Sequence, residues 1–449
     1  MNTITESKAN SNGRAKPATR FAGNFAMTAG AQVAILAIGG LTGVIAARLL
    51  GPQGRGELAA LTLWPSMLVL LASMGINQAI VFYTGRRQDT VSQVWAGSTL
   101  IGLLQSACVV AAGFLLIPLA LAHYSEGVRH LSLAFLAASP LVVLGGYPAN
   151  LLQGKLALGS FNLARLTAPA VYAVGLLIVS VLGGSSLGSV VTLQILGITA
   201  AMGLGYVLLL RKTGLRFLWD AGTCKNLLTF GCKTQLANVS YYVNQSADQL
   251  ALSLFVPPRE LGLYVVAVTL ASAVCFLPQA AGIVTLATGS SSHPAEARII
   301  IADSFRVSLL ALVILCTVLY FAAPWLIGMV FGPAFSGATL ACRILLPGMI
   351  AVGLCQVIYD GARALGEPAL PSYSEAGGVL VTCVSLWLLV PRWGFVGAAI
   401  ASTLTYFVTL LVILILCGTR MQIGLGSLLG LPAKRTAEFK PSSTNFGWS

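Results

Sequence analysis

The stretch PLVVLGGYPANLLQGKLALG at residues 140–159 recurs in altered form as PGMIAVGLCQVIYDGARALG at residues 347–366. The two copies lie 207 residues apart and agree at six of twenty positions, where a chain so rich in Gly, Ala and Leu would give roughly one or two by chance. A weaker echo pairs LGPQGRG at residues 50–56 with FVPPRELG at residues 255–262, at nearly the same offset. The chain is therefore predicted to consist of two halves with a common fold.

The composition places both halves in a membrane. Of 449 residues, 57% are hydrophobic and only 9% are charged, whereas soluble domains carry about 25% charged residues. A helix needs about 20 largely apolar residues to cross a bilayer. Twelve runs satisfy this and predict an all-α polytopic protein with six helices in each half: 21–49, 57–83, 92–121, 130–153, 163–183, 187–210, 228–255, 261–288, 305–331, 337–362, 372–390 and 396–418.

The basic residues predict the orientation of these helices. With a cytoplasmic N-terminus, one side of the membrane receives 20 Lys and Arg and the other side receives six, as the positive-inside rule requires. The net charge of +13 is thus explained by topology, and no nucleic-acid partner is expected. An even number of helices per half predicts a parallel repeat about an axis along the membrane normal. The expected organisation is a tail (1–20), an N-terminal lobe (21–210), a cytoplasmic linker (211–225), a C-terminal lobe (226–420) and a cytoplasmic tail (421–449).

The run 228–255 is unusual because it contains the polar sequence TQLANVSYYVNQSADQLALS at residues 234–253. At about 100° per residue, its polar side chains fall on one side of a helix. Hydrocarbon satisfies no hydrogen bonds, and an acid at mid-membrane costs about 2.5–3.5 kcal/mol. The stripe is therefore expected to line a substrate cavity, through Gln235, Asn238, Tyr241, Tyr242, Gln245, Asp248 and Gln249.

Other predicted spans carry smaller polar groups that could line the same cavity. Asn24 and Gln32 share one face of the first span, Asn77 lies in the second, and Gln153 lies near the end of the fourth. For any single amide, the alternative is an ordinary interhelical hydrogen bond, which is worth about 0.6 kcal/mol on average.

No set of residues predicts an enzyme. The chain contains no GxxxxGK[ST] phosphate-binding loop, so ATP is not expected to drive it directly. It also lacks an acidic cluster suited to a catalytic metal, and no metal site is expected.

Several phrases resemble a known family. They are ARLLGPQGRGELAAL at residues 47–61, LIGMVFGPAFSGATLACRILLPG at residues 326–348, and the GxxALG motifs at residues 154–159 and 361–366. These are similar to the polysaccharide flippases of the multidrug/oligosaccharidyl-lipid/polysaccharide (MOP) superfamily. The resemblance spans nearly the whole chain. It implies two six-helix lobes around a central cavity, and export of an undecaprenyl-pyrophosphate-linked oligosaccharide by alternating access.

Such a substrate requires cations as well as amides, because a pyrophosphate is best bound by Arg or Lys. No predicted mid-membrane position carries either residue, so the phosphate contacts are expected at the two mouths of the cavity. For each candidate, the simpler alternative is that the cation only fixes the orientation of its helix at the membrane surface. The candidates are Arg20, Lys155, Lys233 and Arg363 on the inner side, and Arg48, Arg55 and Arg343 on the outer side.

The leading hypothesis is thus a non-enzymatic flippase in the bacterial inner membrane, acting in exopolysaccharide or lipopolysaccharide assembly. Its expected partners are membrane lipids, the lipid-linked oligosaccharide, a polysaccharide polymerase and glycosyltransferases. No cofactor is expected, and H⁺, Na⁺ or the membrane potential would drive transport. Two alternatives stay open: a cation-coupled multidrug exporter of the same superfamily, with Asp248 as its ion site, and a membrane polysaccharide polymerase or ligase. The predicted outer loops are short, which disfavours the last.

Overall fold

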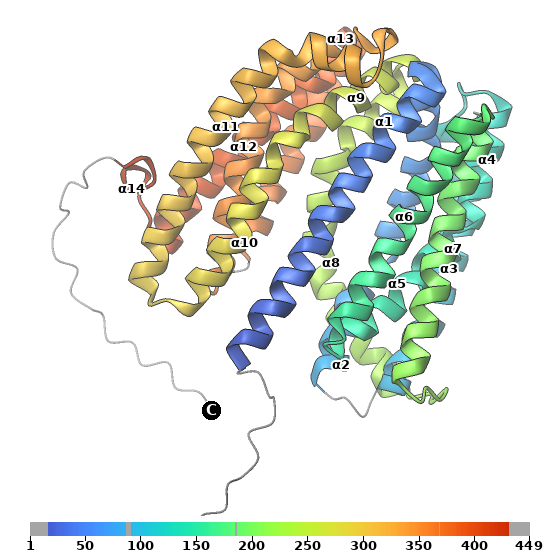
Figure 1. Cartoon of the computed structure of the whole chain (residues 1–449), viewed down its shortest axis with the longest axis vertical. Coiled ribbons are helices and arrows are strands. Elements are labelled where there is room, and N and C mark those ends of the chain that lie inside the picture. Colours follow the sequence, from blue (N-terminus) through green and yellow to red (C-terminus); the bar gives the residue numbers. More distant parts are fainter. Residues whose placement is uncertain (1–16, 87–90, 185, 368, 431–449) are drawn as a thin grey trace, which may run out of the picture. The chain divides into compact units, whose positions relative to one another are not determined.

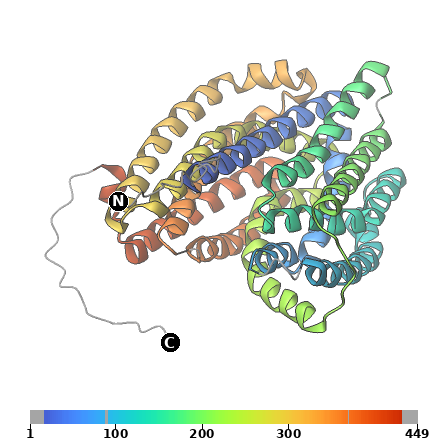
Figure 2. The same cartoon turned by 60° about the horizontal axis from the view of Figure 1, so that its bottom comes forward.

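The computed structural model describes residues 17–86, 91–184, 186–367 and 369–430, except for some side chains within these ranges. Every regular element in these ranges is a helix (Figures 1 and 2). In chain order the elements are α1 (Pro17–Ala72), α2 (Ile76–Arg86), α3 (Val91–Ala120), α4 (Glu126–Ala137), α5 (Ser139–Gly154), α6 (Leu158–Leu182), α7 (Leu187–Lys212), α8 (Ala221–Phe255), α9 (Pro258–Ser272), the 3₁₀ turn η2 (Ala273–Cys275), α10 (Phe276–Ser291), α11 (Pro294–Val330), the 3₁₀ turn η3 (Pro333–Phe335), α12 (Ala338–Ala364), α13 (Leu370–Leu416), the π-helical turn η4 (Cys417–Met421) and α14 (Leu425–Leu429).

Two of these helices each account for two predicted spans. Gly51 in α1 has φ 65° and Gly394 in α13 has φ 54°, a left-handed conformation that glycine adopts without strain. Each glycine therefore divides a long helix into two. Nine stretches of the described residues are long and apolar enough to cross a membrane. With α1 and α13 divided and the more polar α8 added, they reproduce the twelve predicted spans and confirm the predicted all-α fold class.

The predicted helix ends are less accurate than the spans themselves. α6 begins at Leu158 instead of 163, α8 at Ala221 instead of 228, and α11 at Pro294 instead of 305. Hydropathy locates only the apolar part of a helix, whereas hydrogen bonding continues into its polar end. At the start of α8, the Asp220 side chain accepts hydrogen bonds from the backbone N–H and the hydroxyl of Thr223 at 2.7 and 2.5 Å. These bonds hold the pKa of the Asp220 carboxyl below its usual value.

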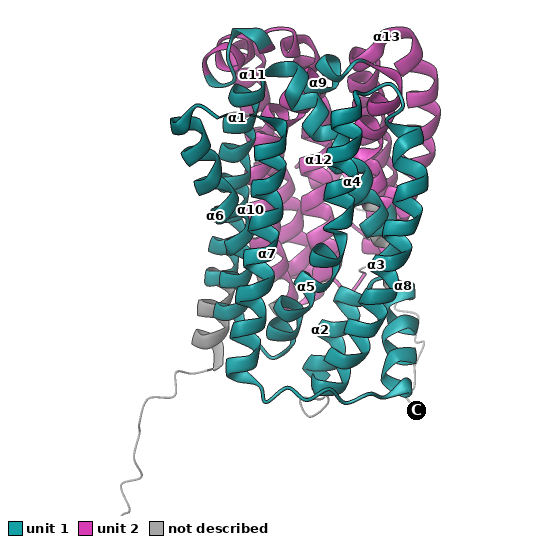
Figure 3. Cartoon of the chain, turned by 90° about the vertical axis from the view of Figure 1, so that its right-hand side faces the viewer, with its two compact units in different colours: residues 1–239, 257–262, 330–334 teal, residues 240–256, 263–329, 335–449 magenta. Residues whose placement is uncertain are grey.

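The chain divides by its internal packing into two compact units (Figure 3). Unit 1 comprises residues 1–239, 257–262 and 330–334, and unit 2 comprises residues 240–256, 263–329 and 335–449. The border between them falls inside α8. This division follows packing, so the domain bounds expected from the sequence remain predictions.

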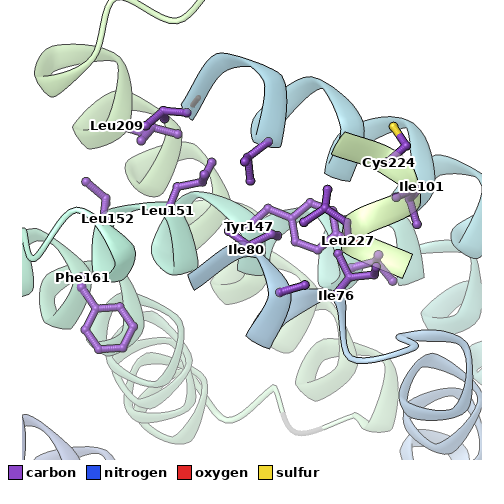
Figure 4. Packing of buried hydrophobic residues seen from close by; sticks show 14 residues of the cluster. Ile76, Ile80, Ile101, Tyr147, Leu151, Leu152, Phe161, Leu209, Cys224 and Leu227 are labelled. Atoms are coloured by element: carbon purple, nitrogen blue, oxygen red, sulfur yellow. The ribbon is translucent and has the colours of Figure 1, made fainter. Parts of the chain in front are cut away.

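Unit 1 contains an apolar core that α2, α3, α5, α7 and the start of α8 share (Figure 4). Ile76, Ile80, Leu151 and Leu227 are all almost fully buried there. Tyr147 lies within this core, and its hydroxyl donates to Gln105 Oε1 at 3.2 Å. The core fixes the position of α2 against α5, which carry one of the polar sites described below.

Unit 2 is built around α12. This helix packs against α10 and α13, and its small residues allow close contacts with α11. Gly353 lies against Leu312, and Gly361 lies against Ile301. α12 also belongs to the internal repeat, so the GxxALG motif at residues 361–366 marks a helix contact and a helix end.

The weaker repeat motif forms a close backbone contact within unit 1. A Cβ atom on Gly56 would overlap the carbonyl of Pro258, and one on Gly262 would overlap the carbonyl of Pro52. The contact is therefore reciprocal between two repeat-related glycines. Only glycine lets the two backbones approach in this way.

This contact predicts that Gly262→Ala destabilises the protein. Overpacking of a tight site typically costs about 1–3 kcal/mol, and here the obstacle is backbone that cannot rotate away. We expect a lower thermal unfolding temperature in detergent and less folded protein in the membrane. Gly39→Ala is the matched control, because nothing lies within 4 Å of its added Cβ. An equal effect of both substitutions would contradict the prediction.

Candidate functional site

The first polar group joins α1 and α6 in unit 1. Asn162 Nδ2 donates to Thr28 Oγ1 at 3.2 Å, and Arg165 NH2 donates to Gln32 Oε1 at 2.7 Å. The Arg165 guanidinium also lies 5.1 Å from the centre of the Phe161 ring. The polar face that the sequence predicts around Gln32 is thus turned toward α6.

Arg165 is a cation that the sequence analysis missed. It lies about two turns inside α6, within the candidate membrane span Leu158–Leu182 and near the start of the predicted run 163–183. The residue is half-buried, and none of the ion pairs formed among the described residues includes it. A charge inside a membrane helix costs about 2.5–3.5 kcal/mol on insertion scales and is by default a sign of function. The spacing of Asn162 and Arg165, three residues apart, is the sequence signal that could have indicated it.

The second polar group forms a pocket between α2 and α5, also in unit 1. Four carboxamides line it together with Val81 and Phe82, and water-sized molecules can occupy about 420 Å³ of it. Asn150 Nδ2 donates to Asn77 Oδ1 at 2.8 Å, which connects the two helices. Two predicted cavity residues meet here, Asn77 and Gln153, and the other two amides are Gln78 and Asn150.

The polar stripe of α8 is divided between different roles. At its beginning, Gln235 Nε2 donates to the Leu70 carbonyl at 2.6 Å, and Gln105 Nε2 donates to the Ser73 carbonyl at 3.2 Å. Both carbonyls lie where the helix breaks between α1 and α2. Each also accepts a backbone N–H from three residues further on, from Ser73 at 3.2 Å and from Ile76 at 3.0 Å. The amide of Gln235 therefore caps this helix end, and this hydrogen bond explains its polarity without a substrate.

Further along α8, Asp248 is buried in unit 2. Its Oδ2 accepts hydrogen bonds from the Tyr264 hydroxyl at 2.5 Å and from the Ser402 hydroxyl at 3.0 Å. Its Oδ1 accepts from the Gln249 backbone N–H at 2.7 Å. Neutral donors alone surround this carboxyl, and none of the ion pairs among the described residues includes it.

A third polar group lines a small cavity of about 40 Å³ in unit 2, between α8, α12 and α13. Asn244 Nδ2 donates to Glu375 Oε2 at 2.6 Å, and the Tyr359 hydroxyl donates to Glu375 Oε1 at 2.9 Å. Gln245, a predicted cavity residue, also lines this pocket. Glu375 was missed, although an acid inside the apolar run 372–390 was a readable signal.

The other predicted cavity residues are less informative. Tyr242 is exposed and Gln249 is half-buried. The side chains of three predicted cavity residues lie outside the described part: Asn24, Asn238 and Tyr241.

The predicted phosphate-contact residues mostly have local partners. Arg48 Nε donates to the Val330 carbonyl at 2.6 Å, and Arg343 Nε donates to the Tyr320 carbonyl at 3.0 Å. Arg363 pairs with Asp360, three residues earlier in the last turns of α12, at 2.7 Å. Three residues have other surroundings: Arg55 has a buried Nε without a partner among the described residues, Lys155 follows the last residue of α5, and Lys233 is exposed. The side chain of Arg20 is not described.

The fold and the polar groups can now be compared with known proteins. A family model described as "Polysaccharide biosynthesis protein" matches residues 45–339. The chain belongs to this family. The match covers residues 50–56, 140–159 and 255–262 of the repeat but not residues 347–366, and it confirms the family resemblance read from the sequence. No curated protein matches the chain by sequence.

Solved structures of similar fold come from the MOP superfamily. The lipid II flippase MurJ in an inward closed conformation has a TM-score of 0.74 at 14% identity, and covers 90% of this chain and 91% of its own. An inward-facing multidrug resistance MATE family transporter has a TM-score of 0.71 at 13% identity, with 88% and 96% covered. A MOP superfamily transporter from Pyrococcus furiosus has a TM-score of 0.61 at 14% identity, with 89% and 95% covered. This member of the polysaccharide biosynthesis family therefore has the fold of MOP superfamily transporters.

The surroundings of Asp248 predict different effects on folding and on transport. Asp248→Asn keeps an acceptor oxygen for the Tyr264 and Ser402 hydroxyls, but it cannot take up or release a proton. We expect polysaccharide export in a complemented deletion strain to fall more than the amount of protein in the membrane. Glu296→Gln, which removes the charge of an exposed acid, should change neither export nor membrane abundance. A parallel loss of abundance and export would show that Asp248 is structural.

Proposed function

We propose that this protein is a flippase that moves an undecaprenyl-pyrophosphate-linked oligosaccharide from the cytoplasmic to the periplasmic leaflet of a bacterial inner membrane. The oligosaccharide is a building block of a surface polysaccharide. Transport proceeds by alternating access between two six-helix lobes, the mechanism typical of transporters with parallel repeats. Both termini of the chain are cytoplasmic.

Arg165 is the observation that carries this proposal. A half-buried guanidinium inside a membrane helix, hydrogen-bonded to one amide and with no acidic partner among the described residues, retains most of its capacity to bind an anion. Guanidinium groups bind phosphate oxygens through paired hydrogen bonds. A pyrophosphate would supply the missing counter-charge, so that the desolvation of Arg165 is offset only when substrate is bound.

The remaining polar groups fit the other parts of the substrate. The amides between α2 and α5 offer donors and acceptors to hydroxyl groups of a glycan. The prenyl chain needs no site in the protein, because it can stay in lipid. Membership of a polysaccharide biosynthesis family supports this assignment. The partners would then be glycosyltransferases that supply the lipid-linked glycan and a polymerase that consumes it.

Unit 2 supports coupling to a cation. Asp248 and Glu375 are acids inside the apolar part of the chain, and both accept hydrogen bonds from neutral donors. An acid in such surroundings can exchange H⁺ or Na⁺ during transport without leaving the helix that carries it. The driving force is then an ion gradient or the membrane potential, with no tightly bound cofactor.

The same acids favour a second candidate function, cation-coupled export of amphipathic cationic drugs. A cationic drug would bind near Glu375, whereas Arg165 would repel it. The two candidate functions therefore require different substrates. The flippase would bind an anionic substrate in unit 1, and the drug exporter would bind a cationic substrate in unit 2.

Reconstitution into proteoliposomes distinguishes the two functions. We expect undecaprenyl-pyrophosphate-linked oligosaccharide to become accessible to a membrane-impermeant glycosidase added on the opposite side. Empty liposomes should show no such change. If the lipid-linked glycan stays inaccessible while an imposed proton gradient drives uptake of a cationic dye, the drug-exporter hypothesis replaces the flippase.

Variants of Arg165 test the phosphate contact directly. We expect Arg165→Gln to lower the flipping rate at least about tenfold, since a charged hydrogen bond is worth about 1.5–3 kcal/mol. Arg165→Lys should retain part of the activity, because it keeps the charge but loses the paired geometry. Arg392→Gln, which removes an exposed cation, should have little effect. Full activity of Arg165→Gln with normal membrane abundance would exclude a role in substrate binding.

A further inference from the structure

We infer that the pocket between α2 and α5 is a subsite for an uncharged sugar ring of the transported glycan. This inference rests on the proposed function and narrows it, because it assigns one part of the substrate to one pocket. The pocket is lined by Asn77, Gln78, Val81, Phe82, Asn150 and Gln153.

The amides of this pocket are only partly satisfied by the protein. Asn150 and Asn77 share one hydrogen bond. Gln78 and Gln153 make no side-chain hydrogen bond to any other described residue, and Gln78 is exposed. Each carboxamide offers two N–H donors and a carbonyl acceptor. The pocket therefore presents free donors and acceptors side by side, which matches the alternating donor and acceptor character of sugar hydroxyls.

Hydrocarbon would not satisfy the amides that line this pocket. Asn150 and Gln153 belong to the candidate membrane span Glu126–Gly154, where hydrocarbon would leave the amides without partners at a cost of several kcal/mol per group. The volume of about 420 Å³ that water-sized molecules can occupy lies within the range typical of small-molecule sites, about 300–1,000 Å³. Water or a polar ligand must therefore fill it.

The internal repeat shows that the fold does not require an amide at every position of this pocket. Counting 205 to 207 residues further along the chain, the counterparts of Asn77 and Gln78 fall among Gly282, Ile283, Val284 and Thr285. The counterpart of Asn150 is the apolar Val357, whereas that of Gln153 is the acidic Asp360. The helical framework of unit 2 is thus built without the Asn77–Asn150 pair, so helix packing alone does not explain that pair in unit 1.

The electrostatics of the pocket favour a neutral ligand. No lining residue is ionisable. α2 ends at Arg86 and α5 at Gly154, and Gly85 lies against the carbonyl of Gly154, so two negative helix ends are adjacent beside the pocket. Arg86, in the last turn of α2, lies 5.0 Å from the centre of the Phe82 ring, where it offsets the negative end of its own helix. Lys155 follows the end of α5 directly, so the cations beside the pocket serve mainly to offset two negative helix ends. A neutral hexose or N-acetylhexosamine would form hydrogen bonds to the amides without a charged partner.

Saturation-transfer difference NMR on the full chain in detergent tests this subsite, since it detects weak sugar binding. The probes are glucose, N-acetylglucosamine and glucuronate. The double variant Gln78→Leu/Gln153→Leu removes two amides that make no internal hydrogen bond, so it should fold normally. Gln53→Leu is the matched control, because Gln53 is exposed outside the pocket.

We expect both neutral sugars to give saturation transfer with the parent protein and with Gln53→Leu. The double variant should lower these signals about tenfold, as the loss of two neutral hydrogen bonds predicts. Glucuronate should give a much weaker signal in every case. Equal signals from the double variant and the parent, or a stronger signal from glucuronate than from glucose, would overturn the inference.

The same variants in the proteoliposome assay separate this inference from the proposed function. If the parent protein flips the lipid-linked glycan but the double variant binds neutral sugars as the parent does, the subsite is wrong and the flippase stands. If the parent flips no glycan while the double variant loses sugar binding, the subsite stands and the flippase is wrong.

Discussion

A polar group inside a bilayer must find its hydrogen-bond partners within the protein or in trapped water, because hydrocarbon offers none. This constraint accounts for most of what distinguishes one helix of this chain from another. Where a helix breaks between α1 and α2, the carbonyls of Leu70 and Ser73 receive the amides of Gln235 and Gln105. Polar side chains that are not needed for such hydrogen bonds within the protein are the candidates for binding a substrate.

The two units satisfy the constraint with opposite chemistry. In unit 1, the groups left over are a guanidinium, Arg165, and the amides between α2 and α5. In unit 2, they are carboxyl groups, Asp248 and Glu375, which hydroxyls and one amide surround. Glycans and phosphates suit the first set, and protons or sodium ions suit the second. The proposed transport cycle would use the two units for substrate and for driving force respectively.

Much of the fold could be predicted from residues that act locally. Apolar length gave the spans, and the repeat at residues 140–159 and 347–366 gave the two halves. The helix ends were less accurate, because hydropathy does not register a polar turn such as the start of α6. Arg165 lies near the start of the predicted run 163–183 and was counted with the cytoplasmic cations, whereas the structure places it about two turns inside a candidate membrane span. For the candidate site, two of the eleven predicted cavity residues, Asn77 and Gln153, line one pocket. Their role in transport stays a prediction, and Glu375 was overlooked.

The sequence by itself determined that this protein lies in a lipid bilayer, how many spans it has and to which family it belongs. Composition, length and short motifs are properties of a chain before it folds. The tertiary structure decided which polar residues form hydrogen bonds between helices and which remain available to bind a ligand. Gln235 and Gln153 are both amides in apolar runs, and nothing in their local sequence separates them. Only packing shows that the first bonds to a backbone carbonyl of the broken helix, whereas the second lines an open pocket.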